Sequence, residues 1–395
     1  MKCNTVRIED ICTFVTSGGT PLTSVQSYYT PKEIPWLKTG EVNYCRIYNT
    51  EFYISKEGLE RSSAKLIPAN SVIVAMYGQG DTAGRVAINK IPLSTNQACC
   101  NLIINQEKAD YEYVYYTLCT LYERLVALKN GGAQPNLNAK IIKEIKIPLP
   151  ELDIQHRIAS VLAAYDELID NNQKQIKLLE EAAQRLYKEW FVDLRFPGYE
   201  DVHIVDGVPE GWSVKSMDDI ADYLNGYAFK PSDWGKIGKP IIKIKELNEG
   251  ISKDTPRNTG DDVPEKYSVY AGDIIFSWSA TLTAKIWDAE EGLLNQHLFK
   301  VTPNKGIARE YVLQSILKTL EEFSYLTTGS TMKHIQRGKL KQVFVKVPTQ
   351  DIMNKYETVA DTYREQILVL THKVILLQEA RDRLLPKLMS GEIEL

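Results

Sequence analysis

The sequence lacks the motifs that many nucleotide-using and methyl-transferring enzymes carry. It has no Pro-Pro dipeptide, which excludes the Asn-Pro-Pro-aromatic pocket of amino-methyltransferases, and no G-x-x-x-x-G-K-[ST] loop of the kind that holds ATP. Its histidines show no metal-ligand spacing: His156, His203, His297, His334 and His372. We therefore expect a binding protein without a catalytic centre or a metal site of its own.

Cysteine is scarce, and its distribution argues against a disulfide or zinc framework. None of the cysteines has C-x-x-C spacing, and all lie in the first third of the chain: Cys3, Cys12, Cys45, Cys99, Cys100 and Cys119. We expect them to be free, reduced and mostly buried thiols.

Long apolar runs and a strong charge of one sign are also absent. No stretch reaches the length of a membrane span and no signal peptide follows Met1, so we expect a soluble, cytoplasmic protein. The formal net charge of the 395 residues is −4, and bulk electrostatics therefore do not indicate nucleic-acid binding. Any basic surface must be local, or a partner must supply part of the positive charge.

What the sequence does contain is a pair of heptad repeats. The first runs from about Pro150 to Asp193, and its length predicts a helix of about 60 Å that needs an equally long partner. The second begins at Pro348. The predicted seam residues are Ile158, Leu162, Tyr165, Ile169, Ile176, Leu179, Ala183, Leu186 and Trp190 in the first helix, and Tyr356, Ala360, Tyr363, Ile367, Leu370, Val374, Leu377, Leu384 and Leu388 in the second.

The two heptad stretches share residues as well as a period. Many identities recur at an offset of 198, Pro150 with Pro348 and Asp153 with Asp351 among them, which indicates an internal duplication. The duplication predicts a first globular domain at 1–150, a first long helix at 151–193, a linker at 194–210, a second globular domain at 211–347, and a second long helix with a C-terminal tail at 348–395. Two unrelated surface helices are the alternative.

Each globular part shows a mixed α+β pattern. Short strands alternate with turns, and a helix is expected from Tyr111 in the first part and from Arg309 in the second. The strand ending at Lys38 is repeated at Lys243, 205 positions later. The predicted fold class is therefore α+β, with two similar domains and two long helices that form an antiparallel intramolecular coiled coil. The sheet topology stays open.

Loops in both repeats combine cationic side chains with short hydrogen-bonding ones. Cations can bind phosphates while amide and hydroxyl groups read base edges, so we predict DNA binding by these loops. Ordinary solvated turns are the alternative for any single residue. The candidate DNA-binding residues are Lys38, Thr39, Gln79, Thr82, Arg85, Gln134, Asn136, Lys243, Lys245, Thr281, Lys285, Thr331, Lys333 and His334.

Several stretches resemble the specificity subunits of type I restriction-modification enzymes. These are 147–155 at the entry of the first long helix, 178–191 near its end, the terminal 383–393, and the glycine-bearing loops 131–137 and 329–335. The segment 350–356 is less typical of the family. The resemblance implies two target recognition domains separated by two helices, a bipartite double-stranded DNA target, and no catalysis by this chain.

The resemblance also implies partners that carry the chemistry. Two modification subunits would methylate adenine with S-adenosylmethionine, and restriction subunits would add translocation and cleavage driven by ATP and Mg; no cofactor is expected in this chain. We expect the exposed helix faces to dock the modification subunits, through residues such as Gln155, Arg157, Lys174, Lys177, Glu180 and Arg185.

Three further expectations concern recognition. The loops differ between the repeats, so the target should be asymmetric, with each domain reading one half, and the helices should set the unread spacer. The antiparallel arrangement should bring Leu395 back near the first domain. Two other functions stay open: a fused adenine methyltransferase with its own recognition domains, and a coiled-coil scaffold that does not bind DNA.

Overall fold

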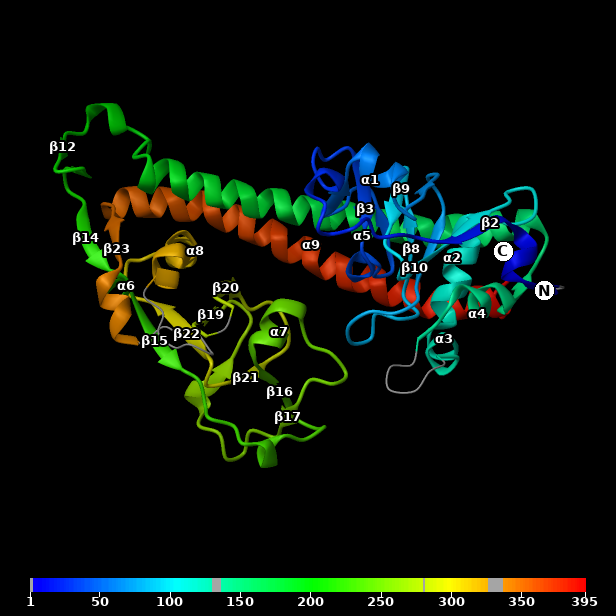
Figure 1. Ribbon diagram of the computed structural model, residues 1–395. Helices are drawn as coiled ribbons and strands as arrows, with labels where there is room; N and C mark the ends of the chain where they lie inside the picture. Colours follow the sequence, from blue (N-terminus) through cyan, green and yellow to red (C-terminus); the bar gives the residue numbers. More distant parts are fainter. Residues whose placement is uncertain (1–2, 130–135, 280, 326–336) are drawn as a thin grey trace. The chain divides into compact units, whose positions relative to one another are not determined.

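The computed structural model describes residues 3–129, 136–279, 281–325 and 337–395 (Figure 1). The chain divides into two compact units. Unit 1 comprises the residues up to Asn171 together with Val374–Leu395, and unit 2 comprises Asn172–Lys373. The tail that ends at Leu395 thus belongs to the same unit as the first domain, as the antiparallel arrangement predicts.

Unit 1 contains two main sheets. The larger has the strand order β2 (Cys12–Ser17), β10 (Cys99–Ile104), β7 (Val72–Ala75), β8 (Val86–Asn89) and β4 (Cys45–Ile47). The smaller has the order β5 (Phe52–Ile54), β3 (Ile34–Leu37), β9 (Leu93–Thr95) and β6 (Leu66–Ile67), and β1 (Asn4–Arg7) pairs with β11 (Lys146–Leu149). The helices of the domain are α1 (Lys56–Glu60), α2 (Tyr111–Thr120), α3 (Tyr122–Ala127) and α4 (Ala139–Glu144).

Unit 2 repeats this plan. Its larger sheet has the order β15 (Ala221–Asn225), β22 (Leu298–Pro303), β19 (Ile274–Ser277) and β20 (Thr283–Ile286). Its smaller sheet has the order β17 (Arg257–Asn258), β16 (Lys239–Ile242), β21 (Gly292–Leu294) and β18 (Ser268–Val269). Two strand pairs are β14 (Ser213–Ser216) with β23 (Phe344–Val347), and β12 (Ile204–Val205) with β13 (Val208–Pro209); the helices are α6 (Met217–Ile220), α7 (Ile244–Glu249) and α8 (Arg309–Tyr325).

The two main sheets of each unit match strand for strand except at one edge, and unit 2 has in addition the short pair β12 with β13. In each smaller sheet the central pair is parallel, β3 with β9 and β16 with β21, which requires the same chain crossover. In the larger sheets β8 pairs with both β7 and β4, whereas β20 pairs with β19 alone among the described residues. The correspondence confirms the predicted duplication, and β4 has no counterpart in the described part of unit 2.

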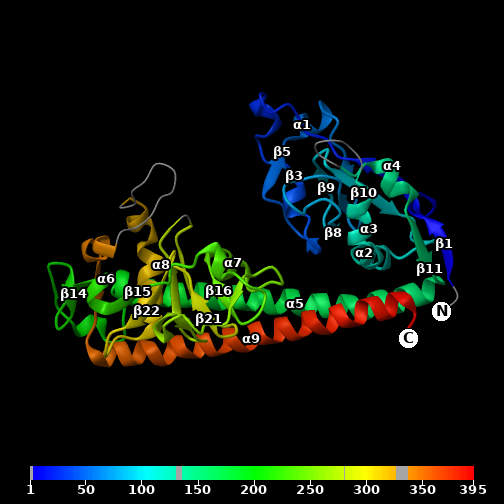
Figure 2. The same ribbon diagram turned by 90° about the horizontal axis from the view of Figure 1, so that it is seen from below.

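The long helices α5 (Leu152–Tyr187) and α9 (Gln350–Ser390) contribute to both units. In unit 1, Ile158 and Leu162 at the start of α5 share a hydrophobic core with Leu388 and Met389 at the end of α9, and Figure 2 shows these two segments side by side. In unit 2 the end of α5 shares a core with the start of α9, which includes Tyr356. The helices are therefore antiparallel within each unit, as predicted.

The seam residues differ in how far they are buried. The buried ones are Ile158, Leu162, Ile169, Ala183, Tyr356, Ala360, Leu370, Val374 and Leu388. The partly buried ones are Tyr165, Ile176, Leu179, Leu186, Trp190, Tyr363, Ile367, Leu377 and Leu384. At the end of α5 the helix widens into a π-turn at Lys188–Val192, which places Phe191 in the core of unit 2. The strict heptad does not hold there, because the extra residue of the π-turn rotates the buried face.

The described cysteines form no disulfide, and Cys99 and Cys100 are buried. Burial raises the pKa of the Cys100 thiol to about 12, so it stays protonated near neutral pH. None of the helices in the described part of the chain combines the length and the apolar character needed to cross a lipid bilayer.

Candidate nucleic-acid interface

A lysine stands at the same place in both units, directly after a central strand of the smaller sheet. Lys38 follows β3 and Lys243 follows β16, and each precedes a short helical turn. The turn is capped in the same way in both units: the backbone amide of Lys38 donates to Glu41 over 3.1 Å, and that of Lys243 donates to Glu246 over 3.2 Å. This capping fixes the point at which each lysine leaves its strand.

An aromatic ring orients the ammonium group of each of these lysines. Lys38 Nζ lies 3.4 Å from the centroid of the Phe52 ring, and Lys243 Nζ lies 5.2 Å from that of Trp234. Both side chains are half-buried, so each presents its charge from a defined direction. Thr39 beside Lys38 is 8% exposed, whereas Lys245 on α7 is exposed.

The loop between β7 and β8 is held by its own side chains. The Thr82 hydroxyl donates to the Gln79 carbonyl over 2.6 Å, and Arg85 donates to Asp81 over 2.6 Å. The hydrogen bond from Arg85 lowers the pKa of the exposed Asp81 carboxyl. Thr82 is 9% exposed and serves the turn, while Gln79 lies exposed.

A contact between a cation and an asparagine joins two candidate loops in each unit. In unit 1, Arg85 donates to the side-chain oxygen of Asn43 over 3.0 Å. In unit 2, Lys285 donates to the backbone carbonyl of Asn248 over 3.4 Å. Asn248 lies 205 positions after Asn43, at the same offset as the two capped lysines. The structure thus brings the Lys38 and Arg85 segments together, and likewise the Lys243 and Lys285 segments.

The remaining candidates fall into two groups. Thr281 and Asn136 are described and exposed. Gln134, Thr331, Lys333 and His334 lie outside the described residues.

Sequence reasoning missed a further contact beside these loops. Thr20, which follows β2, hydrogen-bonds to Gln97 in the turn between β9 and β10. In unit 2 the backbone amide of Gln296 donates to Tyr227, and the ring of the adjacent His297 lies 6.2 Å from that of Trp278. A signal is present in the sequence, because the pair Asn96-Gln97 recurs as Asn295-Gln296, but the repeated pair alone does not show which side chains it contacts.

A buried ion network, also missed, ties the domain of unit 1 to its helices. Arg46 on β4 binds Glu112 of α2 over 2.6 Å and Asp166 of α5 over 2.7 Å. Arg381 of α9 binds the other oxygen of Asp166 over 2.7 Å, and Lys90 binds Glu112 over 2.8 Å. Because every buried charge has a partner of opposite sign, the network fixes the domain on the helices.

One predicted docking residue proves to belong to the interior. Gln155 is 1% exposed; its side chain accepts from the Asp110 amide over 3.0 Å and donates to the Pro150 carbonyl over 2.8 Å. Its role is to join α5 to the start of α2, so the expectation that it lies on an exposed docking face is wrong. The other residues named for that face, Arg157, Lys174, Lys177, Glu180 and Arg185, are exposed.

The chemistry of these loops suits recognition of a polyanion with hydrogen-bonding edges. Ammonium and guanidinium groups are held on capped turns beside amides and hydroxyls, as contacts to phosphates and bases require. Within the described ranges, no group of three His, Cys, Asp or Glu side chains is placed to hold a metal ion.

Comparison with known proteins identifies the family. Residues 2–181 and 209–360 match the type I restriction modification DNA specificity domain, so the chain belongs to this family. It is 28% identical to the type I restriction enzyme MjaIX specificity subunit of Methanocaldococcus jannaschii, over 96% of this chain and 91% of the relative. It is 30% identical to the EcoR124I/EcoR124II specificity subunit of Escherichia coli, over 45% of each protein.

A solved structure shares the fold. The S subunit of a type I restriction-modification system from M. genitalium superposes with a TM-score of 0.59 at 16% identity, covering 98% of this chain and 96% of that one. The chain is thus a non-catalytic, sequence-specific DNA-recognition subunit of a type I restriction-modification enzyme. Family membership implies DNA and a methyltransferase as partners, and it decides against both the fused methyltransferase and the scaffold without DNA.

Proposed function

We propose that each unit reads one half of a bipartite, asymmetric DNA target. The observation that carries this proposal is the recurrence of the capped lysine and of the cation-asparagine contact in both units. The frame is shared, but the side chains on it differ: Thr39 beside the first lysine corresponds to Ile244 beside the second. Two similar frames with different reading groups favour two different half-sites.

In this proposal α5 and α9 set the length of the unread spacer. A helix the length of α5 rises about 54 Å, which matches a span on the order of one to two turns of DNA. Lengthening both helices should therefore change the spacer while both half-sites persist.

We further propose that exposed helix residues dock two modification subunits. The charged residues Arg157, Lys174, Lys177, Glu180 and Arg185 support this role because they are exposed on α5. S-adenosylmethionine, ATP and Mg would then be bound by the partner subunits, with restriction subunits in the complete assembly. A cytoplasmic location belongs to the same proposal, since the complex must reach its DNA.

The decisive experiment exchanges residues 211–347 for the corresponding domain of another specificity subunit and maps methylated sites by sequencing. We expect one half of the target to change while the other half and the spacer stay. A target in which both halves change would overturn independent reading.

Point variants test the same division more finely. Lys38→Gln and Lys243→Gln should each weaken binding to one half-site, and Thr281→Ala should act on the second half-site, each by about 1 to 3 kcal/mol. Lys305→Gln, an exposed lysine outside the candidate loops, is the control. Equal effects of Lys38→Gln on both halves would argue for a contact shared by the two.

A further inference from the structure

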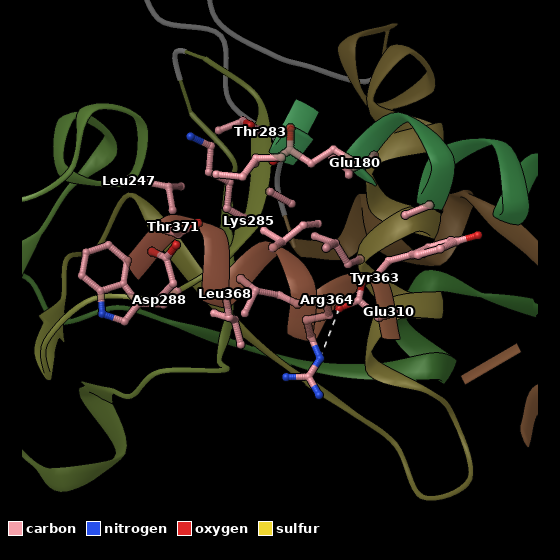
Figure 3. A pocket seen from close by; sticks show the side chains of 18 of the residues that line it. Glu180, Leu247, Thr283, Lys285, Asp288, Glu310, Tyr363, Arg364, Leu368 and Thr371 are labelled. Atoms are coloured by element: carbon pink, nitrogen blue, oxygen red, sulfur yellow. Dashed lines mark ion pairs between the residues drawn. The ribbon is translucent and has the colours of Figure 1, made fainter. Parts of the chain in front are cut away.

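Both units have a cavity between the domain and the long helices. In unit 1 it measures about 260 Å³ and is lined by Tyr116, Asp166 and Arg381, which belong to the ion network. In unit 2 the corresponding cavity is larger. The cavity has a volume of about 550 Å³ and is bordered by α5, α8, α9 and the strand β20. Figure 3 shows Glu180, Lys285, Asp288, Glu310 and Arg364 around it. Every residue that lines it belongs to unit 2.

The internal duplication shows which side chains are missing from this place. Glu310 corresponds to Glu112 at the offset of 198, but neither cation that binds Glu112 has a cationic counterpart. Lys90 corresponds to Asp288, and at the offset of 205 Arg46 corresponds to Ile251, which lies in no strand. Unit 2 thus has the acidic group but no cation at either of the two positions that neutralise it in unit 1.

Glu310 is consequently a buried carboxylate with too few partners. It is 6% exposed, and its Oε1 has no hydrogen-bond donor among the described residues. Its ion pair with Arg364 Nε is long, at 3.7 Å, and Arg364 also binds Asp361 over 3.2 Å. Burial raises the pKa of Glu310 to about 7, and burial likewise raises the pKa of the half-buried Asp288.

The same place also has an open sheet edge. In unit 1, β4 runs parallel to β8 and brings Arg46 beside Ile88. The corresponding strand β20 has Ile286 at that register position, because Val72 faces Ile88 as Ile274 faces Ile286. No described strand covers this edge of β20. An edge of this kind is a template for a strand from another chain.

We propose that an extended, arginine-bearing segment of the modification subunit adds to β20 as a parallel strand and places its guanidinium beside Glu310, as β4 and Arg46 do in unit 1. The excess of carboxylates around the cavity favours a cationic segment over an acidic or apolar one. That the partner is the modification subunit rests on the function proposed above. That its segment is a parallel strand with an arginine is inferred from β4 and Arg46 in unit 1.

Hydrogen exchange tests the added strand directly. The full-length chain is compared alone and in complex with its cognate modification subunit. We expect amides of Thr283–Ile286 to exchange at least tenfold more slowly in the complex. A complex that forms while these amides exchange unchanged would overturn this inference and leave the reading of half-sites intact. A chain that does not bind the modification subunit at all would overturn the docking proposal and this inference together.

A matched pair of variants tests the charge. Glu310→Gln keeps the shape but removes the carboxylate, and should weaken binding of the modification subunit about tenfold. Glu321→Gln, an exposed glutamate on the same helix α8, should leave the affinity unchanged. Equal affinities of the two variants would exclude a role for Glu310.

A peptide supplies a probe that does not depend on the modification subunit. Its sequence is that of residues 42–50, the segment around β4, with serine in place of Cys45. We expect saturable binding to the full-length chain that slows exchange at Thr283–Ile286, and at least tenfold weaker binding when the arginine of the peptide is replaced by glutamate. Binding that is insensitive to this replacement would show that the cavity does not select a cation.

Discussion

The two units differ in how the buried glutamate between the domain and the long helices is neutralised. Each must attach a sheet domain to a pair of long helices, and each uses a buried glutamate on the domain helix to do so. In unit 1 the glutamate belongs to a network of two arginines, a lysine and an aspartate, in which every charge is paired. In unit 2 the glutamate has one distant arginine, and the cavity beside it measures about 550 Å³ against about 260 Å³ beside the network of unit 1. Duplication preserved the frame while the charges on it diverged.

The difference lies in which positions of the long helices carry a charge. Asp166 of the first network corresponds to Arg364 in the second, and Arg381 corresponds to Ala183. Because Arg364 stands where unit 1 has Asp166, unit 2 lacks the carboxylate that binds a second arginine in unit 1. What remains in unit 2 is a carboxylate that is easily protonated beside an open strand edge.

The largest effect is expected from breaking the network of unit 1. Arg46→Met should lower the free energy of unfolding of this unit by about 3 to 5 kcal/mol, because it leaves two buried carboxylates short of a cation. Urea unfolding followed by hydrogen exchange would resolve the units. Arg364→Met is the matched variant in unit 2, and its cost should be about 1 kcal/mol since its ion pair is long and partly exposed. Equal costs would remove the contrast between the units.

A second prediction concerns a position at which the units agree. Gly18 and Gly226 each lie against carbonyl groups of the turn that follows β9 or β21, and a Cβ at either would overlap those oxygens. Alanine at each should cost about 3 kcal/mol in its own unit. Gly40→Ala is the control, because a Cβ there meets no atom within 4 Å. A tolerated Gly226→Ala would mean that the two turns are not equivalent.

In the third prediction, replacing the buried glutamate by glutamine changes stability in opposite directions in the two units. Glu310 has a pKa of about 7 in the folded chain against 4.5 ordinarily, so its cost to stability is absent below pH 4.5 and develops as the pH rises to 7. Glu310→Gln should therefore stabilise unit 2 by about 2 to 3 kcal/mol at pH 8 and have little effect at pH 4. Glu112→Gln should instead destabilise unit 1. Thermal unfolding across this pH range measures both, and a pH-independent effect of Glu310→Gln would contradict the assignment.

Sequence analysis could predict the architecture because the duplication and the heptads are properties of periodicity. Identical residues at one offset required two similar domains, and apolar residues at helical spacing required a helix pair. The lysines after β3 and β16 were found in the same way. The π-turn at Lys188–Val192 was not, because a single extra residue in a helix leaves no periodic signal.

The buried charges escaped prediction for a different reason. Arg46, Glu112 and Asp166 are separated by 66 and 54 positions and meet only after the sheet and helices have packed. Gln155 was placed on the surface because a polar residue on a helix is usually solvated, and the carbonyl and amide groups that bind it come from other elements. A lone polar residue does not reveal its partners.

A fourth prediction tests the hydroxyl within the network. The Tyr116 hydroxyl donates to Asp166 over 2.5 Å and accepts from Arg46 over 2.8 Å. Tyr116→Phe should cost about 2 kcal/mol, because hydrogen bonds to buried charged groups are among the stronger ones. Its counterpart in unit 2 is Gln314, which borders the cavity, and Gln314→Leu should cost less. Denaturant unfolding measures the loss of free energy of unfolding in the two variants. A larger loss for Gln314→Leu than for Tyr116→Phe would contradict the view that the polar contacts of unit 1 are the stronger ones.

The smallest effect is expected at Tyr356 of α9, the counterpart of the apolar Ile158. The Tyr356 ring is fully buried among aromatic side chains, 4.8 Å from Phe191, but its hydroxyl has no hydrogen-bond partner among the described residues. A buried hydroxyl without a partner costs free energy that the ring alone does not, so Tyr356→Phe should stabilise unit 2 by up to about 1 kcal/mol. Thermal unfolding of Tyr356→Phe and Tyr116→Phe measures this. Both variants lose a tyrosine hydroxyl, but the first should gain stability and the second should lose it. A loss of stability in Tyr356→Phe would mean that the hydroxyl has a hydrogen-bond partner, as the Tyr116 hydroxyl has in unit 1.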